Sequence, residues 1–364
     1  MRGPGRKWDS PLALQLKNYC VKYIMFENIH NWPLEHWHIE LCSKCSLQCP
    51  RCSRQEVPEG LTNSDLTLKW FKENWTGKLL TDVKKITFCG DDGDPIYAKD
   101  LLKILSWLRE NNDQVQFVIV TNGSYKTKSW WEKLDKILNE KDHIHFSLDG
   151  WDQMSNNIYR VNCNWFSIMT GINAMRKSKA HKTWAAIAFK FNEHKIFDMQ
   201  EMAKKLAFDS FQLTLSSKFG KNYDTYPKDD PLQPSDKFIA SGRFTRTTVG
   251  LSGKKWHDNC VDIFTKRFYN IDSTPSIIPL CMIGNKGLYL NAKGKFYPCC
   301  WTALRYGHNK DIFEYIKPSQ TLGQVLDDPM WKKLFGDIRN GTAPRECGEK
   351  CSAKKWSLDH ATQW

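Results

Sequence analysis

The stretch CSKCSLQCPRCSR, residues 42–54, carries four cysteines: Cys42, Cys45, Cys49 and Cys52. Zinc sites of the ribbon or finger type separate two cysteine pairs by about a dozen residues or more, so that the chain can fold back on the ion. Here only residues 46–48 separate the two CxxC pairs, and wrapping all four thiols around one ion would strain the loop. The CxxxCxxC triplet over 45–52 can instead hold three corners of a cubane 4Fe–4S cluster and leave the fourth iron open for chemistry.

Length and composition set the class of protein. A chain of 364 residues predicts one large α/β unit with a smaller appendage, and 41% hydrophobic with 26% charged residues is typical of a globular protein. The sequence has no apolar run long enough for a membrane helix, and its N-terminus lacks the apolar core of a secretory signal. Thirteen cysteines in such a chain favour a cytoplasmic, reducing setting and metal or cluster ligands rather than disulfides.

The formal net charge of +13 raises the question of a nucleic-acid partner. The basic residues alternate with 40 acidic ones and form no long basic block, so lysines scattered over solvated helices explain the charge as well. No GxGxxG or Walker-type loop is present, which argues against nucleotide-dependent hydride or phosphoryl transfer.

Strand-like and helix-like segments alternate from about residue 36 to residue 218, which predicts parallel βα units. The predicted strands lie within 36–41, 83–89, 114–124, 143–150, 183–194 and 210–217. The predicted helices lie within 64–79, 99–111, 129–138, 164–178 and 197–209, and Ser64 or Asp65 is expected to cap the first. In such a sheet, ligand-binding residues lie at the carboxyl ends of the strands, where the turns DGDP (92–95), TNG (121–123) and SLDG (147–150) fall.

CxxxCxxC after the predicted strand HWHIEL resembles the cluster loop of the radical S-adenosylmethionine (SAM) enzymes. In that family the open iron binds the amino and carboxylate groups of SAM. The resemblance implies a partial (β/α)6 barrel over residues 36–220, with Cys45, Cys49 and Cys52 as cluster ligands. It leaves Cys42 as a buried or loop thiol, and Arg51 stands where the family often has an aromatic residue.

The same resemblance implies a cofactor pocket. The turn DGDP is similar to the family's GGEP turn, with Asp92 for the first glycine and the shorter Asp94 for the glutamate, whose task Asp91 can share. The residues it assigns to SAM binding are Gly93, Asp94, Asn122, Ser147, Asp149, Arg160 and Asn192. Arg160 would pair with the cofactor carboxylate, as a guanidinium suits, or lie on a surface helix. Taken alone, GDDGDP reads as a plain turn or a weak calcium-like site.

A second cysteine set lies near the C-terminus. GLYLNAKGKFYP predicts a β-hairpin with its turn at Asn291–Gly294, which would bring Cys281 and Cys299 together. With Cys347 and Cys351 they make four thiols, which by count fit zinc or an iron–sulfur cluster, and Cys300 can replace Cys299. C-x(9–15)-G-x4-C resembles the opening of the SPASM motif in its shortened "twitch" form, and implies one auxiliary 4Fe–4S cluster.

These observations predict residues 1–35 as an N-terminal extension, 36–220 as the radical SAM core, 221–279 as a linker or insertion over the active site, and 280–364 as a small auxiliary-cluster domain. Within the insertion, His257 and Cys260 are read as structural, with a ligand role as the alternative.

The resemblance implies a function as well as a fold. A one-electron reductant such as flavodoxin or ferredoxin would reduce the cluster, and SAM would be cleaved to a 5′-deoxyadenosyl radical. That radical would abstract hydrogen to oxidise or crosslink a peptide or small molecule. The alternatives are a radical SAM modifier of RNA or nucleotides, and a non-catalytic zinc protein that binds nucleic acid. No membrane partner is expected.

Overall fold

The computed structural model describes residues 35–56, 58–59, 61–216, 218–219, 226–241, 246–254, 288–297 and 299–300, with single positions 303, 329 and 333. The chain divides into two compact units. One comprises residues 37–258 and 290–294 and is called the core unit below; the other comprises 1–36, 259–289 and 295–364. Most described residues belong to the core unit.

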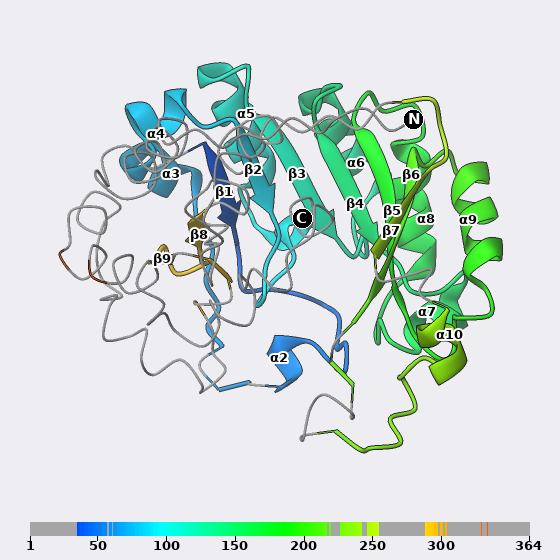
Figure 1. Ribbon diagram of the computed structural model, residues 1–364. Coiled ribbons are helices and arrows are strands. Elements are labelled where there is room, and N and C mark those ends of the chain that lie inside the picture. The colour runs from blue at the N-terminus through cyan, green and yellow to red at the C-terminus, as the bar shows by residue number, and fades with distance from the viewer. Residues whose placement is uncertain are drawn as a thin grey trace, which may run out of the picture. The chain divides into compact units, whose positions relative to one another are not determined.

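The core unit is organised around a sheet with strand order β7-β6-β5-β4-β3-β2-β1 (Figure 1). The strands are β1 (His36–Ile39), β2 (Lys85–Phe88), β3 (Gln116–Thr121), β4 (His143–Ser147), β5 (His181–Ala188), β6 (Ser210–Leu215) and β7 (Arg246–Gly250). Neighbours from β2 to β6 run parallel, and β7 pairs antiparallel with β6. Each strand from β1 to β6 corresponds to a predicted one, so the α/β class with a large parallel sheet is confirmed.

The helices occupy the connections that a parallel sheet requires. They are α2 (Ser53–Glu56), α3 (Leu68–Asn74), α4 (Lys78–Thr81), the short η2 (Pro95–Tyr97), α5 (Leu101–Asn111), α6 (Lys128–Ile137), α7 (Gln153–Asn157), α8 (Trp165–Ala174), α9 (Ile196–Lys205) and α10 (Asp236–Ala240). Because successive strands are spatial neighbours, right-handed crossovers place the connecting helices on one face of the sheet. Within the described residues, no helix is long and apolar enough to cross a membrane.

The two faces of the sheet differ in chemistry. The helix-covered face is aromatic: the ring of Phe146 in β4 lies 5.4 Å from that of Trp131 in α6, and Trp37 in β1 lies 4.8 Å from Trp75 after α3. On the other face, the strands from β2 to β6 bear buried polar side chains: Lys85, Gln116, His143, His145, His181 and Ser210. The period-two pattern thus sorts apolar residues toward the helices and polar ones to the opposite face.

One predicted helix start is wrong. Thr67 caps α3, and its side chain accepts a hydrogen bond from the backbone of Trp70 at 3.1 Å. Ser64 and Asp65 are already engaged with the cysteine loop, since the backbone N–H of Ser43 donates to Ser64 O at 3.0 Å and Asp65 pairs with Cys42 in an isolated bridge. Because Ser64 and Asp65 are held by the cysteine loop, α3 begins further along the chain than predicted.

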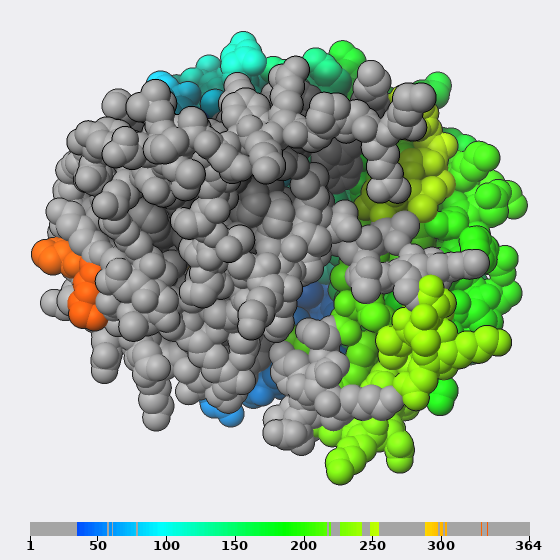
Figure 2. All heavy atoms as spheres, in the orientation of Figure 1, coloured from blue at the N-terminus to red at the C-terminus, as the bar shows by residue number. Residues whose placement is uncertain are grey.

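The predicted linker after residue 220 contains regular structure. Strand β7 pairs with β6 in the register Ser210↔Gly250, and α10 is capped by Ser235, whose side chain accepts from the backbone of Phe238 at 3.2 Å. The space-filling view shows the green and yellow-green part of the chain, which includes α9 and α10, at the outer surface (Figure 2). The Pro-, Asp- and Lys-rich stretch 220–235 precedes both elements and gives the region the look of a loop.

The hairpin predicted near the C-terminus is present. Strands β8 (Leu288–Leu290) and β9 (Phe296–Tyr297) flank a turn that closes with a 2.9 Å hydrogen bond from Gly294 N–H to Asn291 O. Gly294 has a φ of 74°, the left-handed region that glycine adopts readily.

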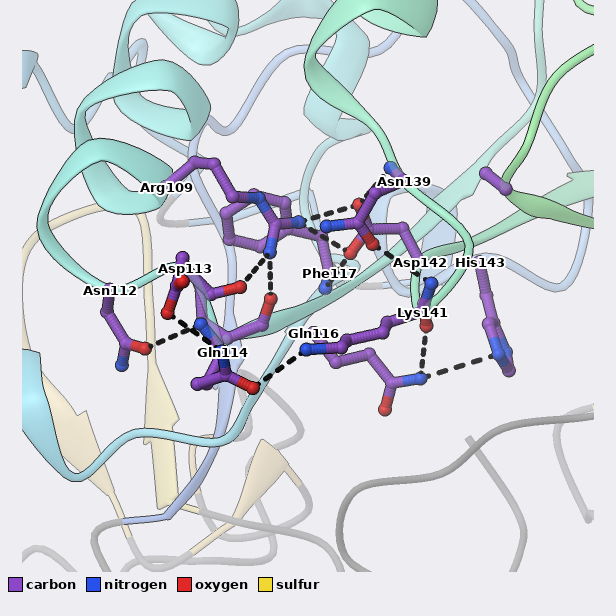
Figure 3. A network of polar contacts seen from close by, with 12 residues as sticks. Arg109, Asn112, Asp113, Gln114, Gln116, Phe117, Asn139, Lys141, Asp142 and His143 are labelled. Atoms are coloured by element: carbon purple, nitrogen blue, oxygen red, sulfur yellow. Dashed lines mark hydrogen bonds and ion pairs between the residues drawn. The ribbon is translucent and has the colours of Figure 1, made fainter.

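A buried ion pair fixes α5 to the start of β4 (Figure 3). Arg109 donates from Nη2 to both carboxylate oxygens of Asp142, at 2.8 and 2.6 Å, and its guanidinium lies 4.4 Å from the ring of Phe117. The carboxylate also accepts backbone N–H groups of Phe117 at 2.7 Å and Asn139 at 2.8 Å. The side chain of Asp142 is completely buried, so its charge depends on these partners.

We expect Arg109→Lys to lower the free energy of unfolding by about 2 kcal/mol, because an ammonium keeps the charge but cannot also replace the Nη1 bonds to the carbonyls of Asp113 and Val115. Urea unfolding followed by tryptophan fluorescence measures the loss. Arg176→Lys is the matched control, since Arg176 is exposed and makes one bond, to Lys205 O at 2.9 Å. Equal losses in the two variants would contradict a special role for the Arg109 fork.

Candidate functional site

The cysteine loop, residues 42–54, leaves the carboxyl end of β1. Cys45 and Cys52 are half-buried, Cys49 is 8% exposed, and all three are free thiols. The backbone N–H of Cys52 donates to Cys49 O at 3.0 Å, and α2 begins with the next residue. This hydrogen-bonded turn reverses the direction of the chain between Cys49 and Cys52. The three thiols therefore lie on one short loop.

The three thiols interact electrostatically. Burial, with smaller contributions from Asp94 and the other two thiols, raises the pKa of Cys45 to about 12. Burial also raises the pKa of Cys49 to about 11, opposed by the nearby Arg160. In the metal-free loop Cys45 and Cys49 are therefore neutral thiols, and a bound metal would supply the positive charge that makes them thiolates.

The three thiols are suited to a cluster. Within the described part of the chain, no group of three or more His, Cys, Asp or Glu side chains is arranged as a site for a single metal ion. A cubane attaches each thiolate to a different iron, so it does not require such a group. Three free thiols that lie close together on one loop can each bind a different iron of the same cubane.

Cys42 is a buried thiol, one of the two placements that the sequence predicts for it. It is 1% exposed, and its thiol donates to Asp94 O at 3.3 Å, inside the protein. Its backbone carbonyl lies against Gly93, where a Cβ would collide with Cys42 O and come within 2.7 Å of Lys44 N. Gly93 is therefore required for the close approach of the two segments.

The turn Gly90–Asp94 after β2 and the cysteine loop form one block. The N–H of Asp94 donates to Lys44 O at 2.9 Å, and the hydroxyl of Ser53 donates to Asp91 O at 2.5 Å. Arg54 donates from Nη1 to Ser43 O at 2.6 Å and also to the carbonyl of Asp92. These bonds fix the cysteines relative to the turn.

Glu40 holds the same turn and was missed by sequence reasoning. Its Oε1 accepts the backbone N–H groups of Asp92 at 2.5 Å and Gly93 at 2.9 Å, and the residue is 2% exposed. Burial, with smaller contributions from the neighbouring Asp92 and Asp91, raises the pKa of Glu40 to about 8. The available signal was a carboxyl at the end of a strand that the pattern places on a buried face.

We expect Glu40→Gln to bind iron like the wild type, because an amide oxygen can accept the same two bonds. Glu40→Ala leaves two buried N–H groups unsatisfied and should lower the free energy of unfolding by roughly 2–4 kcal/mol. Since the raised pKa of Glu40 favours the protonated form in the folded state, the metal-free wild type should lose stability as the pH rises from the ordinary glutamate pKa of 4.5 to about 8. Urea unfolding across that range should show the slope in the wild type but not in Glu40→Gln; equal slopes would contradict the assignment.

Asp94 links the turn to the end of β3. Its carboxylate accepts from Thr121 Oγ1 at 2.8 Å, from the backbone of Asn122 at 2.6 Å and from Asn122 Nδ2 at 2.7 Å, and it caps η2 through Ile96 N–H at 3.1 Å. Burial raises its pKa to about 6, against these bonds. The amide of Asn122 also lies 3.6 Å from Cys45 Sγ. The structure thus brings Asp94 and Asn122 next to a predicted cluster ligand.

Asp149 and Arg160 form a second buried group beside Cys49. Arg160 Nε donates to Asp149 Oδ2 at 2.6 Å, and Asp149 Oδ1 accepts the N–H of Ile187 at 2.7 Å. The side chain of Asp149 is 0% exposed and that of Arg160 16% exposed, which excludes a surface-helix arginine. Burial raises the pKa of Asp149, opposed by Arg160, and the nearby charge of Arg160 also acts to lower the pKa of Cys49.

The other two pocket candidates differ in their surroundings. The amide of Asn192 is used by the protein: it accepts from Phe189 N–H at 2.8 Å and donates to Asp149 O at 2.8 Å and Ile187 O at 2.9 Å. Ser147 ends β4, is half-buried, and its hydroxyl makes no hydrogen bond with any part of the chain that the structure describes. The amide of Asn192 is thus used within the protein, whereas the hydroxyl of Ser147 is not engaged within the described residues.

The C-terminal cysteines are only partly in view. Cys299 and Cys300 are half-buried and follow the hairpin. Cys281, Cys347 and Cys351 lie outside the described residues, as do His257 and Cys260. The auxiliary site therefore stays a prediction.

The fold is similar to that of solved proteins. SuiB of Streptococcus suis bound to S-adenosylmethionine matches with a TM-score of 0.51 and 15% identity, over 93% of this chain and 73% of SuiB. SuiB bound to precursor peptide SuiA matches with 0.52 and 14%, over 93% and 74%. Native anSMEcpe with bound AdoMet and the Kp18Cys peptide matches with 0.53 and 15%, over 90% and 87%. No protein-family model and no curated protein matches the chain. The chain therefore shares the fold of proteins that have been solved with bound S-adenosylmethionine.

Proposed function

We propose that the chain is a radical SAM enzyme that acts on a peptide. The observation that carries the proposal is the triplet Cys45, Cys49 and Cys52, three free thiols on one loop at the carboxyl end of β1. The turn Gly90–Asp94 and the pair Asp149–Arg160 adjoin that loop in the same unit. The fold that the chain shares with SuiB and anSMEcpe supports the same proposal.

The triplet would hold a 4Fe–4S cluster that, with SAM, supplies a radical able to remove a hydrogen atom from the substrate. The chain's residues bind and orient. The Asp94–Asn122 bonds hold the turn beside Cys45, and Arg160, fixed by Asp149, presents a guanidinium next to Cys49 that suits a carboxylate. Ser147 offers a hydroxyl to the ribose or to the substrate.

A peptide substrate is proposed because two proteins with this fold have been solved with peptides, SuiB with SuiA and anSMEcpe with Kp18Cys. An auxiliary cluster on Cys281, Cys299, Cys347 and Cys351 would accept an electron from the substrate radical or bind the peptide. Flavodoxin or ferredoxin is the proposed reductant.

The first test measures iron and acid-labile sulfide per chain after anaerobic reconstitution. With both clusters present, about eight irons should fall to about four in the Cys45/Cys49/Cys52→Ala triple variant. Cys42→Ala is the matched control, because it removes the fourth cysteine of the same loop and should retain the full iron. About four irons falling to none would leave only the triplet cluster. Zinc without iron in the wild type would refute the enzyme proposal.

The second test follows SAM cleavage. The reconstituted protein with dithionite should release methionine and 5′-deoxyadenosine, and the triple variant should release neither. Iron loading without any cleavage in the wild type would contradict radical SAM chemistry while leaving the cluster intact.

A further inference from the structure

A segment far along the chain crosses back to the cysteine loop. This segment, residues 226–235, is called the strap. Arg51, which directly precedes Cys52, donates from Nη2 to Asp230 Oδ2 of the strap at 2.7 Å. The guanidinium of Arg51 also stacks on the ring of Tyr226 at 3.6 Å. One loop residue thus makes both an ion pair and a cation–π contact with the strap.

The first end of the strap is also fastened to the helix that follows the loop. The hydroxyl of Tyr226 donates to Glu56 Oε1 at the end of α2. Lys218 donates to Glu56 Oε2 at 2.8 Å and to Arg51 O at 3.2 Å. Two acidic side chains, Asp230 and Glu56, and the basic side chain of Lys218 therefore lie around Arg51.

The second end of the strap is fastened to the turn after β5. The N–H of Lys190 donates to Leu232 O at 3.2 Å, and Glu193 Oε2 accepts the N–H of Ser235 at 2.7 Å. Asn192, whose amide supports Asp149, lies in the same turn. The strap therefore spans from the cysteine loop to the strand end that carries the Asp149–Arg160 support.

The Arg51–Asp230 ion pair is largely buried, so its loss should weaken the attachment of the strap. The side chain of Asp230 is 0% exposed and that of Arg51 13% exposed. Asp230 Oδ1 accepts the N–H of Leu232 at 2.9 Å, so the same carboxylate shapes the strap's own backbone. Removing one partner leaves a charge in a dry site, which disfavours the closed arrangement far more than the loss of an exposed pair would.

We propose that Arg51 and Asp230 are positioning residues that clamp the strap onto the cysteine loop, fixing Cys52 and shielding the loop from solvent and oxygen. The residue before Cys52 is Arg51, although an aromatic side chain is expected at this position. The aromatic ring comes instead from Tyr226 of the strap, which stacks on the guanidinium of Arg51. The shielding of a cluster rests on the proposed function; the clamp itself does not.

Hydrogen–deuterium exchange on the full chain tests the clamp, with and without reconstituted iron. Asp230→Asn and Arg51→Met should each speed exchange of the strap and of residues 45–55 at least about tenfold. The double variant should exchange no faster than either single variant, because it also removes the unpaired charge that each single change leaves behind. Arg176→Met is the control for loss of an exposed arginine and should leave the strap unchanged.

Two outcomes separate the clamp from the proposed function. Unchanged strap exchange in both single variants would overturn the clamp, whatever the iron content. Faster strap exchange in a chain that binds no iron would uphold the clamp and refute the cluster. In the reconstituted protein, Asp230→Asn should bleach the cluster's visible absorption in air several-fold faster than Arg176→Met, and equal rates would overturn the shielding.

Discussion

Replacing Gly93 by alanine is expected to abolish iron binding at the cysteine loop and to lower the free energy of unfolding by about 3 kcal/mol or more. The new Cβ would collide with the backbone of Cys42 and lie 2.7 Å from Lys44 N. Neither obstacle is the mobile end of a side chain, so the turn and the loop must separate. That movement would also break the bond from Asp94 N–H to Lys44 O. Iron per chain after reconstitution and urea unfolding of the metal-free chain measure the two effects.

Gly253→Ala is the matched control. Gly253 lies in the same unit, and a Cβ there would meet nothing within 4 Å. It should bind iron like the wild type and change stability by less than about 0.5 kcal/mol. Normal iron loading in Gly93→Ala would show that the turn can move away without disturbing the cysteines, and would contradict the single-block description.

The second large effect is expected from Arg160→Met. This change leaves the fully buried Asp149 carboxylate without its cation and should lower the free energy of unfolding by about 3–5 kcal/mol. It also removes the guanidinium beside Cys49, so SAM cleavage should be lost. With the opposing cation gone, the pKa of Asp149 rises further, and the deficit should be smaller at pH 5 than at pH 8.

The double variant Arg160→Met/Asp149→Asn separates stability from function. An uncharged amide in place of the carboxylate removes the buried charge, so most of the stability should return, as measured by urea unfolding. SAM cleavage should stay absent, because the guanidinium is still missing. Recovery of both properties together would reduce Arg160 to a structural counter-ion of Asp149.

The sequence predicted the strands of the parallel sheet because their apolar runs and following turns are local signals. The cap of α3 was misplaced because Ser64 and Asp65 pair with the cysteine loop, a contact that local propensity does not contain. Strand β7 was missed because it is a short edge strand, antiparallel to β6, that lies outside the regular alternation of strands and helices.

The candidate site was predicted in part for the same reason. The cysteine spacing is local and was found, whereas Glu40 acts through hydrogen bonds to residues that follow the next strand. Asn192 was proposed as a cofactor contact from its place after β5, but its amide is occupied by the backbone around it. A position after a strand end predicts proximity to a site, and only the contacts show which side chains remain available.

The separation between Arg51 and Asp230 has a consequence during synthesis of the chain. The two residues are 179 positions apart, and ribosomes add about 5–20 residues per second. The cysteine triplet therefore leaves the ribosome roughly ten to forty seconds before the strap that binds Arg51 has been made. During that interval the thiols are open to oxidants and to stray metal ions, and also to any factor that delivers iron and sulfide. Closure of the strap then sets the end of the period in which the nascent protein can be loaded easily.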